Sequence, residues 1–134
     1  MPPRPLSPHL GVYKFMYTMS LSILHRITGL AAAAGFLLFV WWLMSLANGA
    51  DAYTRAMQLL ASPLAKLLLV GFTFSFVYHF CNGIRHLVWD TGRGLERAQA
   101  RRSGAVVIVA ALLITAVVVW LGCSAFGLAP AVSP

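Results

Sequence analysis

The sequence predicts an all-α membrane protein with three transmembrane helices. Of its 134 residues, 60% are hydrophobic and only 10% are charged, whereas about a quarter of the residues in an average soluble domain are charged. The mean hydropathy is +0.80. The apolar residues also fall in long blocks, and about 20 apolar residues suffice for a helix to cross a bilayer.

The net charge of +7 raises nucleic-acid binding as a possible function. The basic residues, however, cluster at the ends of the apolar blocks, which is the pattern of membrane topology. We therefore expect a lipid bilayer and no nucleic acid. Cys81 and Cys123 lack CxxC spacing and lie in apolar segments, so they are expected to pack as small hydrophobic residues.

The chain is expected to form a single membrane-anchor domain, residues 1–134, that begins with a cytoplasmic arm over residues 1–21. Neither a signal peptide nor an Arg- and Ser-rich transit peptide is visible. Together with Met1, this favours a multi-pass protein of the bacterial inner membrane. Four prolines disfavour a helix at the start of the arm: Pro2, Pro3, Pro5 and Pro8.

The first transmembrane helix is expected over residues 22–48. Residues 27–50 carry no charge, and Trp41 and Trp42 lie toward the far end, where an interfacial aromatic belt is typical. Three small residues permit another helix to approach closely: Gly29, Ala33 and Gly35.

Residues 48–61 are interpreted as a short linker. Ser62 followed by Pro63 is typical of a helix start, with the serine as N-cap and the proline at the first helical position. The second transmembrane helix is therefore predicted over residues 62–90, with Gly92 near its C-cap.

Residues 95–102 form a basic connection that is expected to be a short surface helix. The third transmembrane helix follows over residues 103–126, with Trp120 near its end. Because this segment has no ionisable residue except the thiol of Cys123, we expect it to pack and anchor rather than to form a site.

The distribution of Lys and Arg predicts the orientation, since positive residues accumulate on the cytoplasmic side. The opposite side carries only Arg55 and Lys66. The N-terminus is therefore predicted to be cytoplasmic and the C-terminus periplasmic. The residues on the predicted cytoplasmic side are Arg4, Lys14, Arg26, Arg85, Arg93, Arg97, Arg101 and Arg102.

His79 lies in a stretch free of charge between Lys66 and Arg85. An ionisable residue at membrane depth is costly and usually marks a functional site. Helical spacing puts Phe72 and His86 on the same face. Ser75 and Gly83, four residues before and after His79, lie on that face too. We interpret His79 as an axial haem ligand, and the alternative is a core histidine that bonds a neighbouring helix.

A haem in a helix bundle also needs cations for its propionates and a second axial ligand. Candidates for the propionates are His25, Arg26, Arg85 and His86, whose alternative role is to reach the lipid headgroups. Only His79 lies well inside a span. We therefore expect half of a two-subunit haem-binding bundle, with the second imidazole supplied by another chain.

Ser22 and Arg26 lie one helical turn apart at the mouth of the first span. A hydroxyl and a guanidinium at an apolar boundary suit a lipid-soluble ligand with carbonyl groups, such as a quinone. The alternative is that Ser22 caps the helix and Arg26 anchors it to the cytoplasmic side.

Three motifs resemble the family of large cytochrome b membrane-anchor subunits of succinate dehydrogenase (succinate:quinone oxidoreductase, respiratory complex II). They are RPLSPHLGVYK at residues 4–14, SILHRITG at residues 22–29 and HFCNGIRHLVWD at residues 79–90. The similarity covers the arm and the first two spans, and the third span matches only in being hydrophobic.

The resemblance implies that His79 ligates haem b and that Ser22 and Arg26 line a ubiquinone site, with Asp90 in its hydrogen-bond or proton network. His25 and His86 would lie near the propionates, together with Arg85.

It also implies three partners: a small membrane-anchor subunit that supplies the other haem histidine, an iron–sulfur subunit, and a flavoprotein subunit reached through it. The chain would then belong to an oxidoreductase of the tricarboxylic acid cycle without being catalytic alone.

Two other classes remain open at this point. A purely structural anchor would dock a soluble enzyme to the membrane without a cofactor, and the histidine at membrane depth argues against it. Half of a small-molecule transporter would be expected to show internal repeats or broken spans, and the sequence has neither.

Overall fold

The computed structural model describes residues 16–125, which form four α-helices and no strand. They are α1 (Tyr17–Ala47), α2 (Ala50–Leu60), α3 (Pro63–Asp90) and α4 (Arg97–Ala125). Within this range α1, α3 and α4 are long and apolar enough to cross a membrane. The predicted all-α fold with three spans is therefore confirmed.

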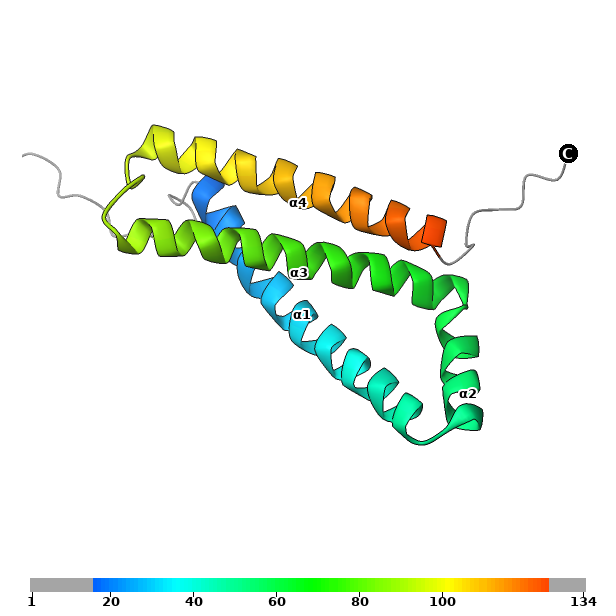
Figure 1. Ribbon diagram of the computed structural model, residues 1–134. Coiled ribbons are helices and arrows are strands. Elements are labelled where there is room, and N and C mark those ends of the chain that lie inside the picture. Colours follow the sequence, from blue (N-terminus) through cyan, green and yellow to red (C-terminus); the bar gives the residue numbers. More distant parts are fainter. Residues whose placement is uncertain (1–15, 126–134) are drawn as a thin grey trace, which may run out of the picture.

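The helices form an open bundle (Figure 1). α3 and α4 run antiparallel side by side, whereas α1 crosses α3 near its own start and then diverges from it. α2 lies across the far side and connects the ends of α1 and α3. We call the end where α1 starts and α3 gives way to α4 the basic end, after Arg26, Arg93, Arg97, Arg101 and Arg102.

Both ends of α3 follow the capping pattern in the sequence. The Ser62 hydroxyl accepts a hydrogen bond of 3.3 Å from the backbone N–H of Ala65, and Pro63 occupies the first turn. At the other end Gly92 has a φ of +78°, a left-handed conformation that glycine adopts without strain. Its N–H donates to the Trp89 carbonyl at 2.8 Å, which ends the helix.

The segment interpreted as a linker, residues 48–61, is instead largely helical, since α2 occupies most of it. One side of α2 is apolar: Ala56 is 2% exposed, and the Tyr53 ring lies 6.4 Å from that of Trp42 on α1. Asp51 lies in the first turn, where a carboxylate favours the helix dipole. The helix is stabilised by packing on α1, which hydropathy does not reveal.

Two helices begin earlier than expected. α1 starts at Tyr17 rather than at residue 22, and α4 starts at Arg97 rather than at residue 103. The basic connection is thus the first part of α4 and no separate helix, because no proline or glycine interrupts residues 97–103. The proline-rich arm, with Arg4 and Lys14, and the last predicted residue of the third span lie outside the described residues.

The buried core is small and lies between α3 and α4. Tyr78, Val107 and Ala111 form its centre. Most large apolar side chains of the three spans are exposed in the isolated chain, so these faces are left for lipid or for other helices. Partly buried residues pack on the core, among them Leu24, Phe74, Val77, Cys81 and Ile108, so Cys81 packs as a small hydrophobic residue as predicted.

Candidate functional site

Three histidines from two helices meet between α1 and α3. The His25 ring of α1 stacks on the His79 ring of α3, with centroids 4.0 Å apart and planes 10° from parallel. His86, two turns after His79, lies 5.2 Å from His25 and meets the Trp89 ring edge-on at 5.1 Å. The structure thus brings together His25, His79 and His86. The helical spacing predicted a shared face only for His79 and His86, and His25 was expected nearer the cytoplasmic interface.

The two nitrogens of His79 have different surroundings. Nδ1 lies 3.1 Å from the backbone carbonyl oxygen of His25. Because a carbonyl can only accept, Nδ1 must carry the proton in this hydrogen bond. Nε2 has no hydrogen-bond partner among residues 16–125. A neutral imidazole in this tautomer presents the lone pair of Nε2, which is the form that a metal ion binds.

Glycines of α1 allow α3 to approach closely. A Cβ atom at Gly29 would lie 2.8 Å from Cε1 of His79, and one at Gly35 would overlap the Phe72 ring. A larger residue at either position would fit only if the His79 or Phe72 ring, or the helices, shifted. The small residues noted in the sequence therefore fix how α1 faces the histidine side of α3.

His25 also has an unsatisfied polar atom. Its Nδ1 is buried and has no hydrogen-bond partner in the described part of the chain. Leaving a buried polar group unpaired costs about 1–3 kcal/mol. A polar group that bonded this nitrogen would remove the cost.

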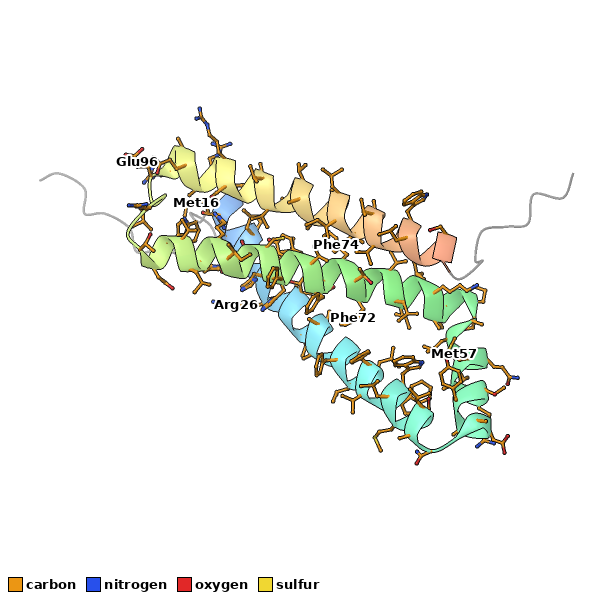
Figure 2. All side chains as sticks on the ribbon, in the orientation of Figure 1. Met16, Arg26, Met57, Phe72, Phe74 and Glu96 are labelled. Atoms are coloured by element: carbon orange, nitrogen blue, oxygen red, sulfur yellow. The ribbon has the colours of Figure 1, made fainter. Side chains whose placement is uncertain are left out.

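Ser22 and Arg26 lie on the outside of α1 near the basic end, and both are exposed. Figure 2 shows Arg26 close to the point where α1 crosses α3. Within residues 16–125 neither side chain has a hydrogen-bond partner. The structure excludes one alternative, since α1 begins at Tyr17 with Met16 as its N-cap. Ser22 therefore does not cap the helix.

Arg85 turns away from the histidines and toward α4. It is only 7% exposed. Its Nε donates to the Ser103 hydroxyl at 2.9 Å and one terminal nitrogen to the Ala100 carbonyl at 2.8 Å. The other donates to Asn82 Oδ1 at 3.2 Å. The guanidinium also lies 3.9 Å above the centre of the Trp89 ring.

Arg85 is thus not brought together with His25, His79 and His86, although the sequence interpretation grouped all four. Asp90 is the last residue of α3 and is exposed. It makes no described contact with Ser22 or Arg26, so the structure brings it to the same end of the bundle but not into a shared cluster.

Residues 1–119 match the family model of the succinate dehydrogenase/fumarate reductase transmembrane subunit. The chain belongs to this family. It is 43% identical over 112 residues to the succinate dehydrogenase cytochrome b556 subunit of Rickettsia prowazekii, covering 84% of this chain and 87% of the relative. The match to the cytochrome b556 subunit of Paracoccus denitrificans is 39% over 111 residues, covering 83% and 85%.

The human mitochondrial cytochrome b560 subunit of succinate dehydrogenase is 40% identical over 112 residues, covering 82% of this chain and 66% of the human protein. The family resemblance that the motifs indicated is therefore confirmed. The names of these members of the transmembrane-subunit family describe cytochromes b, which makes haem the group to test against the site.

The histidine site fits a haem better than a bare metal ion. Among residues 16–125 no group of three or more His, Cys, Asp or Glu side chains is arranged to hold a metal ion. A haem requires little from this chain, because the porphyrin supplies four ligands and only the axial positions are left. His79 has a free Nε2, and a Cβ at Gly83 one turn away would meet nothing within 4 Å.

Several residues near the site were not identified from the sequence. Tyr78 is fully buried, and its hydroxyl donates to the Leu21 carbonyl at 3.3 Å, which ties α3 to α1. Asn82 is 1% exposed and accepts from Arg85. The only sequence signal was their polarity within an apolar span, a signal that His79 gave more strongly because it is ionisable.

Proposed function

We propose that this chain is the membrane-anchoring cytochrome b subunit of a succinate dehydrogenase complex, that it binds haem b through Nε2 of His79, and that it helps form the site where ubiquinone is reduced. A haem bound there would carry electrons one at a time. The observation that carries the haem proposal is the hydrogen bond from His79 Nδ1 to the His25 carbonyl, which orients the ring and leaves Nε2 free.

The second axial imidazole would come from a small membrane-anchor subunit. His25, His86 and Arg26 are the propionate partners in this proposal. The Nδ1 of His25 supports that role, because it is buried and has no hydrogen-bond partner among residues 16–125. We assign Arg85 to helix packing instead, since all three of its nitrogens already donate to this chain.

Ser22 and Arg26 would bind a quinone oxygen, with the guanidinium favouring negative charge that develops there during reduction. Their exposure and lack of partners within the described residues support this assignment. The iron–sulfur subunit would deliver electrons from the flavoprotein subunit, where succinate is oxidised. Asp90 would belong to the surrounding hydrogen-bond network. We place the assembly in the bacterial inner membrane.

The proposal is tested on the purified complex with a His79→Ala variant. We expect loss of most of the b-type haem, measured by the reduced-minus-oxidised spectrum and by haem content per complex, because one axial bond is removed. Leu68→Ala is the matched control: it truncates an exposed side chain of the same helix and should retain haem. Full haem in His79→Ala would contradict the ligand assignment. Wild-type complex without haem would instead favour a purely structural anchor.

A further inference from the structure

The carbonyl oxygen of His25 is shared by two side chains. It accepts from Nδ1 of His79 at 3.1 Å and lies 3.0 Å from the hydroxyl of Thr28. The same hydroxyl lies 2.8 Å from the Leu24 carbonyl. Thr28 is 3% exposed, so water does not compete for these bonds. The hydroxyl therefore lies within hydrogen-bond distance of two carbonyls of the preceding turn, and one of these, that of His25, also accepts from His79.

Gly29, the next residue, lies against the ring of the same histidine. A methyl group there would be 2.8 Å from Cε1 of His79 and 3.1 Å from Nδ1. On α1 the ring is thus in contact with the backbone at Gly29 and with the stacked ring of His25. These contacts hold the ring in the orientation that lets Nδ1 reach the carbonyl.

We propose that Thr28 and Gly29 are positioning residues for His79: Gly29 makes room for its ring, and Thr28 adjusts the strength of the hydrogen bond that its Nδ1 donates. This inference rests on the proposed ligation of haem by His79. It assigns a role to the T-G pair that ends the Ser22–Gly29 motif.

The physical link runs through the basicity of the imidazole. A histidine that donates a stronger hydrogen bond from Nδ1 becomes a stronger donor at Nε2. A stronger axial donor favours ferric over ferrous haem and lowers the reduction potential. Because Thr28 competes for the acceptor carbonyl, its hydroxyl weakens the His79 bond. Removing the hydroxyl should therefore lower the potential of the haem.

The first experiment is a spectroelectrochemical titration of the haem in the purified complex. Thr28→Val removes the hydroxyl and changes the side-chain volume little. We expect a lower reduction potential, equivalent to a roughly three- to tenfold change in the ferrous-to-ferric ratio at a fixed electrode potential, where tenfold corresponds to about 59 mV for one electron. Thr28→Ser, which restores the hydroxyl, should bring the potential back toward the wild-type value.

Thr73→Val is the matched control. The Thr73 hydroxyl makes the same local bond, 2.8 Å to the Leu69 carbonyl, but this carbonyl accepts no bond from a histidine. Its removal should leave the potential unchanged. An unchanged potential in Thr28→Val with full haem would overturn the proposal, and so would an equal shift in both valine variants.

Gly29→Ala tests the second residue. We expect lower haem content or a changed low-spin electron paramagnetic resonance signal, because the ring of His79 must tilt. The control is Gly71→Ala, at a position where a Cβ meets nothing within 4 Å. A wild-type signal in Gly29→Ala would overturn the role of Gly29. If this variant does not assemble, the Thr28 variants decide the proposal.

The two proposals fail in different ways. If His79→Ala keeps its haem, the ligation is wrong and the positioning role falls with it. If His79→Ala loses haem while Thr28→Val keeps the wild-type potential, only the positioning role is wrong.

Discussion

Consecutive residues on α1 differ in burial and contacts. His25 turns inward, where its ring stacks on His79, whereas Arg26 is exposed together with Ser22 one turn before it. Within the described residues no acidic side chain neutralises this guanidinium. An unpaired cation and hydroxyl at the edge of an apolar span are suited to a polar group on a lipid-soluble molecule.

Replacing Arg26 by Leu should therefore impair quinone reduction. We expect kcat/KM for ubiquinone to fall about tenfold or more, which corresponds to the loss of one charge-assisted hydrogen bond. Succinate oxidation with a soluble dye should remain near the wild-type rate, because that reaction bypasses the membrane site. The measurement is the ratio of the two activities in one preparation.

Arg55→Leu is the control for charge removal, because Arg55 is also exposed but lies on α2 at the opposite end of the bundle. It should leave both activities unchanged. Equal loss of dye and quinone activity in Arg26→Leu would indicate defective assembly rather than a quinone contact, and normal quinone activity would remove Arg26 from the site.

For individual residues, the sequence predicts which side chains share a helical face but not what each one contacts on another helix. The i to i+7 spacing placed His79 and His86 together, and both do face α1. Arg85 was expected among them because it is adjacent and positive. Its direction depends on Ser103 and Ala100, which are brought close only by the packing of α4.

At the scale of elements, the contact between α3 and α4 is polar at the basic end and apolar further along. Arg85 joins the two helices through Ser103 and Ala100. The Trp89 ring beneath its guanidinium donates from Nε1 to the Gly94 carbonyl at 3.1 Å, so the turn between the helices is held by the same group. Beyond this point Tyr78, Val107 and Ala111 continue the contact.

Arg85→Leu should therefore destabilise the pairing of α3 and α4. Two interhelical hydrogen bonds are lost, each worth about 0.6–1.7 kcal/mol in membrane proteins, so we expect a loss of about 1–3 kcal/mol. Arg85→Lys should recover only part of it, since an ammonium group lacks the planar fork that reaches several acceptors. The measurement is the denaturant or thermal stability of the complex in detergent.

Arg93→Leu serves as the comparison, because Arg93 is an exposed cation in the turn between the same two helices. It should leave stability unchanged. If Arg85→Leu were as stable as the wild type but shifted the haem spectrum, Arg85 would belong with the propionates instead.

The positions of the helices were largely predictable where bilayer thickness or backbone capping constrains the chain. Span length, the Ser62–Pro63 start and the glycine after α3 all follow from bilayer thickness and backbone capping. α2 could not be found in this way. It is short and of mixed polarity, and its Tyr53 ring packs near Trp42 on α1, a contact that hydropathy does not reveal.

At the scale of the whole molecule, positive charge is concentrated at one end of the bundle. Within residues 16–125, Arg93 and Arg97 lie in the turn before α4 and at its start, whereas Arg55 lies on α2 and Lys66 in the first turn of α3. These two pairs of helix segments lie at opposite ends of the bundle (Figure 1). From the positive-inside rule we predict that the basic end faces the cytoplasm. Ser22 and Arg26 then face the side where soluble partner subunits would dock.

This orientation predicts the behaviour of reporters fused to the full chain in a bacterial host. With three spans we expect the two termini on opposite sides, so a C-terminal alkaline phosphatase should be active, because it folds only in the oxidising periplasm. Green fluorescent protein at the C-terminus should remain dark, whereas the same reporter inserted after Gly92 should fluoresce. The reverse pattern at both positions would show that the bundle has the opposite orientation in the membrane. Ser22 and Arg26 would then lie away from any cytoplasmic electron donor.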